Sequence, residues 1–198
     1  MPARKTSTLT IPDLVLLSLL AEVPMHGYQA NVELERRQIR DWAPISRPQV
    51  YYSMDKLARA GLIRARESSA PPEGPERCVF ATTKRGLAAL ADALERPDWV
   101  SVRERPPFLI WMALSWQASP GVFARQITRR RKFLLRELAR EKLTLAAVRA
   151  EVGHDFHEAV WMIILTIEHF KTELRWLDKI SRQAKRRASA RHPQLAPR

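Results

Sequence analysis

The chain has 198 residues, one cysteine and a formal net charge of +13 at pH 7, with a pI near 10.8. A single cysteine excludes a disulfide framework within the chain, and the longest apolar run, from Leu14 to Leu20, is too short to cross a bilayer. The charge fits a polyanion such as nucleic acid, although charge alone is equally compatible with a merely basic protein. We expect a cytoplasmic protein with no membrane partner and no secretory leader.

Two helices are predicted in the first forty residues. The first begins at the cap-then-proline sequence after Thr10 and runs apolar to Leu20. The second is expected to start near Gly27 and to finish in a charged end at Arg37. A third helix follows a short connection, over residues 46–61, so the order is that of a helix-turn-helix.

The third helix carries the strongest local signals. Ser46 and Gln49 have the spacing of a capping box, Pro48 falls in the first turn, and Gly61 is placed to end the helix. Apolar residues at helical spacing predict a buried stripe of Val50, Met54 and Leu57. The opposite face is expected to read bases or adjacent phosphates in a major groove through Gln49, Tyr52, Ser53 and Lys56. Contacts to the DNA backbone are expected from Arg47 and Tyr51 on this helix and from Tyr28 on the helix before it, and Ser46 is also counted among the DNA-binding residues.

Residues 63–82 predict a β-hairpin with a middle rich in proline, glycine and serine. A basic hairpin beside a recognition helix is a wing, and Arg64, Arg66 and Arg77 are then placed to contact phosphates. The alternative is an ordinary solvated hairpin. Thr83 is expected to cap the next helix, which carries leucines at positions 87, 90 and 94 and ends before a proline.

From about residue 105 the sequence predicts long amphipathic helices. Residues 108–116 are apolar, and residues 122–151 have a stripe of coiled-coil spacing that is interrupted by Arg130 and Glu141. The last helix shows a regular four-three alternation, and a lone helix pair rarely buries such a seam. We therefore assign it to the interface of a homodimer, which would also place two recognition helices about 34 Å apart. The residues are Phe156, Val160, Ile163, Ile167, Phe170, Leu174 and Leu177.

Five of the six tryptophans lie after residue 96, and three of them suggest a ligand pocket. Trp111, Trp116 and Trp161 are candidates to line a pocket for a small planar aromatic effector. The alternative is that these side chains fill an apolar core.

Other candidate sites have simpler explanations. No phosphate-cradling glycine loop, nucleophile elbow or paired zinc cysteines is present in the sequence, so we expect neither an enzyme nor a cofactor. His154 and His157 have a spacing that suits a metal ion, yet the acidic residues beside them are expected at any helix start, and no metal site is predicted. The basic run 129–132 is expected to be the solvated face of a helix.

Four blocks of the sequence together resemble the PadR family of transcriptional regulators. They are Pro24–Tyr28; Val50 and Tyr51 with Met54, Leu57 and Gly61–Ile63; Phe80–Gly86 with Leu90; and Glu173–Leu177. The last block is similar to the helical C-terminal domain of the longer, ligand-responsive and virulence-activator-like members. Two positions depart from the family pattern. Phe80 replaces a tyrosine at the end of the wing, and Met54 replaces a leucine of nearly equal volume.

The resemblance implies a mainly α protein with an N-terminal winged helix-turn-helix, a two-stranded wing and a C-terminal helical dimerisation domain. We expect a DNA-binding domain over residues 1–96, a linker over 97–104, a dimerisation and effector domain over 105–180, and a basic, disordered tail over 181–198. The predicted function is a homodimeric, ligand-responsive repressor that binds a double-stranded operator. A non-sequence-specific nucleic-acid binder or a protein-interaction module is the alternative.

Overall fold

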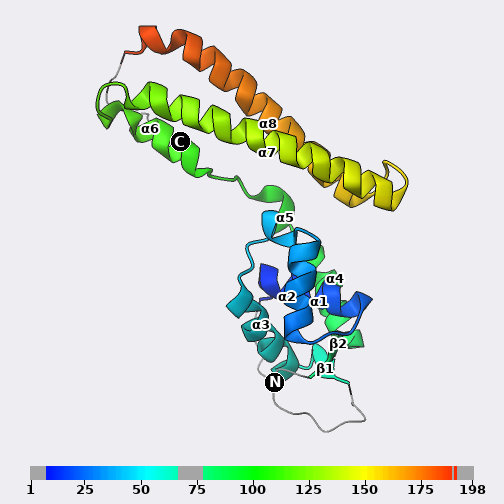
Figure 1. Cartoon of the computed structure of the whole chain (residues 1–198). Helices are drawn as coiled ribbons and strands as arrows, with labels where there is room; N and C mark the ends of the chain where they lie inside the picture. Colours follow the sequence, from blue (N-terminus) through cyan, green and yellow to red (C-terminus); the bar gives the residue numbers. More distant parts are fainter. Residues whose placement is uncertain (1–7, 67–77, 189, 191–198) are drawn as a thin grey trace. The chain divides into compact units, whose positions relative to one another are not determined.

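The structure is a computed structural model and describes residues 8–66, 78–188 and 190. It divides into two compact units, Met1–Arg103 and Glu104–Arg198 (Figure 1). The described residues are mainly helical with one two-stranded sheet, which confirms the predicted fold class. The first unit contains α1 (Ile11–Glu22), α2 (Gly27–Arg36), η1 (Ile39–Asp41), α3 (Arg47–Arg59), β1 (Ile63–Ala65), β2 (Phe80–Thr82), α4 (Lys84–Leu94) and α5 (Asp98–Ser101).

The core of the first unit is built around α1, which contacts α3, α4 and β2. Because α1 is surrounded, it is apolar on nearly all sides, and Leu16, Leu17 and Leu20 are fully buried. The only charged side chain of α1 in this core is Asp13. A buried carboxylate requires hydrogen bonds, and Thr10 and Lys56 donate them to Asp13.

The connection between α2 and α3 is held by one arginine. Arg40 donates from its guanidinium to the Asn31 Oδ1 atom at 2.7 Å and to the Ile45 carbonyl at 2.9 Å. Asn31 is itself buried and donates to the Gly27 carbonyl. Gln38, at the start of η1, adopts a left-handed conformation with φ of 51°. These bonds fix the geometry of the turn, and with it the direction in which α3 leaves.

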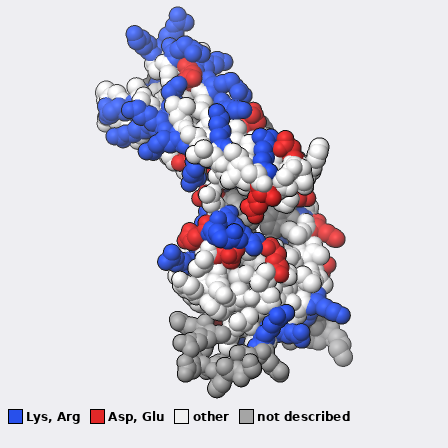
Figure 2. Space-filling model, turned by 45° about the vertical axis from the view of Figure 1, so that its right-hand side comes forward, with Lys and Arg blue, Asp and Glu red and all other residues white. Residues whose placement is uncertain are grey.

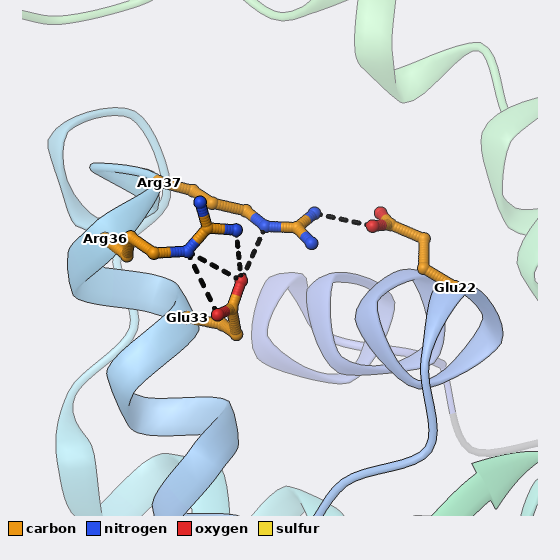
Figure 3. Close-up of polar contacts among 4 residues, drawn as sticks. All are labelled: Glu22, Glu33, Arg36 and Arg37. Atoms are coloured by element: carbon orange, nitrogen blue, oxygen red, sulfur yellow. Dashed lines mark hydrogen bonds and ion pairs between the residues drawn. The ribbon is translucent and has the colours of Figure 1, made fainter.

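A second polar cluster joins α2 to the end of α1 (Figure 3). Glu33 accepts hydrogen bonds from Arg36 and Arg37, and Arg37 also pairs with Glu22 at 2.6 Å. The hydrogen bond from Arg36 is the main cause of a pKa of about 2 for Glu33. The Glu33 carboxylate therefore stays charged at neutral pH. It holds the Arg37 guanidinium, which in turn pairs with Glu22 at the end of α1.

The strands of the wing pair antiparallel, with Ile63 opposite Thr82 and Ala65 opposite Phe80. Phe80 also exchanges both backbone hydrogen bonds with Met25, which lies in the loop between α1 and α2. The predicted hairpin is therefore present at its base, and it is anchored to the helical part of the unit.

The junction between the wing and α4 depends on Thr83 and Gly86. The Thr83 hydroxyl accepts from the Gly86 amide at 3.0 Å, which confirms the predicted cap of α4. A Cβ atom on Gly86 would lie 2.1 Å from the Leu62 carbonyl oxygen, so only glycine fits there. Leu87 and Leu94 of α4 are exposed.

The second unit contains α6 (Pro107–Leu114), η3 (Ser115–Gln117), α7 (Val122–Val152), α8 (Glu158–Gln183) and η4 (Ala184–Arg186). The two long helices lie side by side as an antiparallel pair, joined by a short turn at Gly153 (Figure 1). Phe108 and Trp111 of α6 pack against the cluster that α7 and α8 form around Ile127, Leu134 and Leu177.

The regular seam of α8, which we predicted to face a second copy, is buried for the most part within one chain. Val160, Ile163, Ile167, Leu174 and Leu177 are buried within one chain, and Phe170 packs against the same core. The seam is buried because α7 is long enough to fold back along all of α8. Only Phe156, in the turn between the helices, is 80% exposed.

Arg130 interrupts the apolar stripe of α7 without leaving an unpaired charge. Its guanidinium pairs through two hydrogen bonds of 2.8 Å with Glu173 of α8, and it lies 5.3 Å from the ring centres of Phe108 and Phe133. Arg131 pairs with Asp178 in the same way at 2.7 Å. The two helices are therefore joined by ion pairs as well as by apolar contacts.

The structure differs in part from the linker expected over residues 97–104 and from the disordered tail expected over residues 181–198. The stretch expected to be a linker contains the short helix α5. The tail expected to be disordered from residue 181 is helical through Arg186, since α8 continues into η4; residues 189 and 191–198 lie outside the described part. No helix among the described residues is long and apolar enough to cross a membrane.

Candidate nucleic-acid interface

The start of α3 is fixed by a cap that the sequence predicts. The Ser46 amide donates to the Gln49 Oε1 atom at 2.7 Å, and Pro48 occupies the first turn. The carbonyl of Gln49 is used in this bond, while its amide group remains on the exposed side of the helix. Capping thus orients Gln49 as a donor at the exposed helix start.

The exposed face of α3 is aromatic and polar. Val50, Met54 and Leu57 are buried, as predicted, and the opposite side of the helix faces solvent. Tyr52 is 67% exposed and Tyr51 is 44% exposed. Arg47 is also exposed, and its guanidinium lies 3.6 Å from Glu35. This face carries the donors and ring edges that a major-groove contact requires.

Two residues predicted for this face lie elsewhere. Ser53 is only 2% exposed, because its position turns it toward the core beside the buried stripe. The Lys56 ammonium lies 2.6 Å from the Asp13 Oδ2 atom, and that carboxylate is fully buried. Ser53 and Lys56 therefore do not present free groups to a ligand, and Lys56 instead connects α3 to α1.

The buried Asp13 carboxylate is kept charged by its surroundings. Burial alone would raise its pKa, but the hydrogen bonds from Lys56 and from the amide and hydroxyl of Thr10 outweigh burial, so the pKa of Asp13 is lowered. The other carboxylate oxygen, Oδ1, is buried without a hydrogen-bond partner. Lys56 thus supplies the positive charge that compensates the buried carboxylate between α1 and α3.

Sequence reasoning missed an ion pair on the exposed face of α3. Asp55 and Arg59 are both exposed and pair with each other one helical turn apart. They follow Tyr52 at helical spacing, so a helical wheel drawn from the exposed positions would have found them. A carboxylate here is able to accept from the amino group of cytosine, so Asp55 joins the candidate base-reading residues.

The start of α2 packs against α3 at Gly27. A Cβ atom on Gly27 would lie 2.6 Å from the Tyr51 ring, so this glycine leaves room for the Tyr51 side chain against α2. His26 caps α2 through its Nδ1 atom, which accepts from the Gln29 amide at 3.2 Å. Tyr28, the second residue of α2, is 66% exposed and remains a candidate to contact the DNA backbone.

The wing adds two cations near the C-terminal end of α3. Arg64 and Arg66 are exposed, and neither has an acidic partner among the described residues. Most other arginines of the unit are paired, as Arg37 and Arg59 are. Arg77, the third predicted wing arginine, lies outside the described residues. The wing arginines therefore provide available cations next to the recognition surface.

In the second unit, the three tryptophans predicted to line an effector pocket do not lie together. Trp111 stacks on Phe108 and Phe123 and lines an open pocket of about 340 Å³ together with Phe108, Gln126, Arg129, Arg130 and Phe133. Neither Trp116 nor Trp161 lines this pocket. The Trp161 indole donates to the Asp155 carbonyl at the opposite end of the α7–α8 pair. The three tryptophans therefore do not form one site within a chain.

Comparison with known proteins agrees with this arrangement. The sequence model of the Transcriptional regulator PadR-like family matches residues 16–92, which confirms the resemblance seen in the sequence. No curated protein sequence matches the chain.

Three solved structures share the fold over almost the full chain. Bacillus subtilis PadR in complex with operator DNA has 17% identity and a TM-score of 0.71, covering 88% of this chain and 99% of that one. Bacillus subtilis PadR in complex with p-coumaric acid has 16% identity and a TM-score of 0.71, covering 89% and 99%. The Vibrio cholerae virulence activator AphA has 20% identity and a TM-score of 0.66, covering 90% and 100%.

Proposed function

We propose, from the premise that residues 16–92 belong to the PadR-like family of transcriptional regulators, that this chain is a sequence-specific, double-stranded DNA-binding regulator. The observation that carries the proposal is the exposed face of α3 beside the wing. It combines Tyr51, Tyr52 and the Gln49 amide with Arg64 and Arg66, exposed cations that have no acidic partner among the described residues. Tyrosine and amide groups suit base edges, and the wing arginines suit phosphates.

Selection of oligonucleotides from a random pool by the full chain tests this proposal. We expect enrichment of a palindromic sequence, since a dimer reads two half-sites. Tyr52→Ala should abolish the enrichment, whereas Leu94→Ala, which also truncates an exposed apolar side chain, should preserve it. A pool that gains no sequence preference would favour the alternative, a nucleic-acid binder without sequence specificity.

We further propose that the regulator is a homodimer formed through the helical unit. With the seam of α8 buried in one chain, apolar side chains of this unit still face solvent, and monomers rarely expose so many. Leu165 of α8 is 58% exposed and Trp161, one turn before it, is 54% exposed. Others lie on α6, namely Leu109, Ile110 and Leu114.

Light scattering after size exclusion tests the dimer directly. The chain should have twice the monomer mass, and Leu165→Glu should shift it toward a monomer because a charge cannot be buried at an apolar contact without a partner. Leu143→Glu is a matched control on α7, since Leu143 is even more exposed. A monomeric wild-type chain would rule out this part of the proposal.

We propose that a planar aromatic acid regulates the protein through the pocket beside Trp111. Stacked rings form one wall, and the Arg129 side chain supplies an exposed cation without an acidic partner among the described residues. The structural neighbour solved with p-coumaric acid makes that compound the first probe. Such an effector would make the protein a ligand-released repressor by linkage, because it stabilises one state over another.

Tryptophan fluorescence during titration with p-coumaric acid and other planar carboxylates tests the pocket. A saturable change that is lost in Trp111→Leu and kept in Trp161→Leu supports it. No response in the wild-type chain would remove effector binding at this pocket.

A further inference from the structure

The net charge of the chain is distributed unevenly between its two units. Residues 104–198 carry 19 lysines and arginines against nine acidic residues, whereas residues 1–103 carry 15 against 12, which together make the 34 and 21 of the whole chain. The unit with the candidate recognition helix is therefore close to neutral. Most of the positive charge lies in the helical unit, and this charge has no role in the operator contacts proposed for α3 and the wing.

Within the helical unit, the charge concentrates on the first half of α7. No acidic residue occurs from Val122 to Arg136. On the face drawn in Figure 2, lysines and arginines gather toward the end of the unit that contains the start of α7 and the end of α8. The second half of α7 differs, because its arginines are interleaved with acids, as in the pairing of Arg140 with Glu137 at 2.8 Å.

Four of these cations form a single line, which we call the α7 stripe: Arg125, Arg129, Lys132 and Arg136. Their spacing of four, three and four residues places them on one helix face. All four are exposed, and none has an acidic partner among the described residues. The neighbouring Arg130 and Arg131 point away from the stripe and are neutralised by Glu173 and Asp178.

The stripe faces away from the helix pair. Ile127 and Leu134, on the opposite side of α7, are buried against α8. Like charges three and four residues apart repel along a helix, so the stripe is unfavourable for α7 on its own. An ordinary solvated helix face relieves this repulsion with interleaved acids, and this one has none. A bound polyanion would relieve it instead.

We propose that the α7 stripe is a second DNA-binding surface that contacts the phosphate backbone without reading sequence. The stripe spans about 16 Å, at about 1.5 Å per residue of helix. A duplex carries one phosphate charge per about 1.7 Å of its axis, so a line of this length meets several phosphates. The surface supplies the sequence-independent part of DNA affinity that the nearly neutral first unit lacks.

The burial pattern favours DNA over an anionic membrane as the partner. A helix that lies in a membrane interface inserts an apolar face beside its cations. Ile127 and Leu134 of α7 are already packed against α8, and the apolar side chains beside the stripe, Phe133 and Leu135, are only 40% and 41% exposed, so α7 offers no continuous apolar face to lipid. Arginine also predominates in the stripe, and guanidinium groups match phosphate geometry well.

The test compares three full-length proteins on a labelled duplex of random sequence by fluorescence anisotropy at several salt concentrations. The stripe variant carries R125Q, R129Q, K132Q and R136Q. The matched control carries R175Q, K179Q, R182Q and R186Q, which removes the same charge from the exposed side of α8 and η4. Circular dichroism establishes that both variants keep their helices.

The stripe variant should lower the slope of log affinity against log salt by about three to four, at about 0.9 per phosphate contact. The wild-type chain should then lose roughly 100-fold more affinity than this variant between 50 and 200 mM salt. The control should change the slope by less than one. Equal effects of both variants would mean that only net charge matters, and an unchanged slope in the stripe variant would also overturn the proposal.

Vesicles containing phosphatidylserine provide the remaining arm. Stripe-dependent binding to vesicles, together with stripe-independent binding to the duplex, would assign the surface to lipid and overturn the DNA assignment. The outcome is separable from operator recognition, because a random duplex contains no operator. Loss of sequence preference in Tyr52→Ala would leave the stripe's salt slope intact.

Discussion

Replacing Lys56 by alanine distinguishes an ion pair that anchors α3 from a phosphate contact. The Lys56 ammonium lies 2.6 Å from a fully buried carboxylate, and its own side chain is 25% exposed. Removing one partner of a buried pair costs roughly 3–5 kcal/mol, because the other charge stays buried. Since Lys56 is partly exposed, we expect Lys56→Ala to lower the free energy of unfolding by about 3 kcal/mol, the lower end of that range.

Urea denaturation at pH 7 measures this loss, and two companion variants identify its cause. Asp13→Asn should cost less than Lys56→Ala, because the partly exposed Lys56 is able to reach water. The double variant Asp13→Asn with Lys56→Ala should recover most of the stability lost in Lys56→Ala, since no buried charge remains. If the effects of the single variants simply add in the double variant, the two side chains are not coupled and the reasoning fails.

The pH dependence of this loss follows from the lowered pKa of Asp13. A carboxyl whose pKa is lower in the folded state than its ordinary 3.8 stabilises the fold above that value, and this stability disappears as the pH falls through the folded pKa. Without Lys56, burial acts with less opposition and Asp13 takes up a proton at higher pH. The deficit of Lys56→Ala should therefore shrink from pH 7 toward pH 4. In DNA titrations the slope of log affinity against log salt for Lys56→Ala should stay within about 0.5 of the wild-type slope, whereas loss of a phosphate contact would change the slope by about 0.9.

Three further variants test other parts of the fold and the interface. Arg64→Gln with Arg66→Gln should lower the salt slope of DNA binding by about two, and a slope that does not change would remove the wing from the backbone contacts. Gly86→Ala should cost at least about 2 kcal/mol in urea denaturation, because its Cβ atom would overlap the Leu62 carbonyl; a loss below about 1 kcal/mol would show that the junction yields easily. Glu33→Gln should lower stability at pH 7, with a difference that narrows below pH 4.5 and vanishes near pH 2, the pKa of Glu33; a deficit that is independent of pH would contradict the charged pairing.

Local signals in the sequence predict the first unit well. Ser46, Pro48 and Gly61 mark the ends of α3, and the spacing of Val50, Met54 and Leu57 gives its buried face, as the structure confirms. These signals act within a few residues, so they need no knowledge of tertiary contacts. The positions of Ser53 and Lys56 could not be obtained in this way. Each depends on where α1 lies, and an acid inside an apolar helix, such as Asp13, is the only hint that a buried cation partner is needed.

The second unit shows why a regular apolar seam does not identify its partner. The alternation on α8 fits a second chain and the preceding helix equally well, since both present a complementary stripe. What decides the matter is that α7 has 31 residues and a turn at Gly153 that reverses the chain. Arg130 interrupts the apolar stripe of α7, yet it fits the helix interface because Glu173 of α8 lies opposite to it. Pairing across 43 residues is not visible in a local pattern.

The pocket and the α7 stripe share one residue, and this has a consequence for regulation. Arg129 lines the pocket beside Trp111 and is also the second cation of the stripe. An aromatic carboxylate bound in the pocket would pair with the Arg129 guanidinium, which the proposed stripe uses to contact DNA phosphates. Effector and DNA would therefore compete for Arg129 without any change in the spacing of the recognition helices. Coupling of this kind is reciprocal, so random-sequence DNA should weaken effector binding by the same factor by which the effector weakens that DNA. A regulator controlled only through the geometry of its recognition helices would instead show the coupling with operator DNA and none with a random duplex.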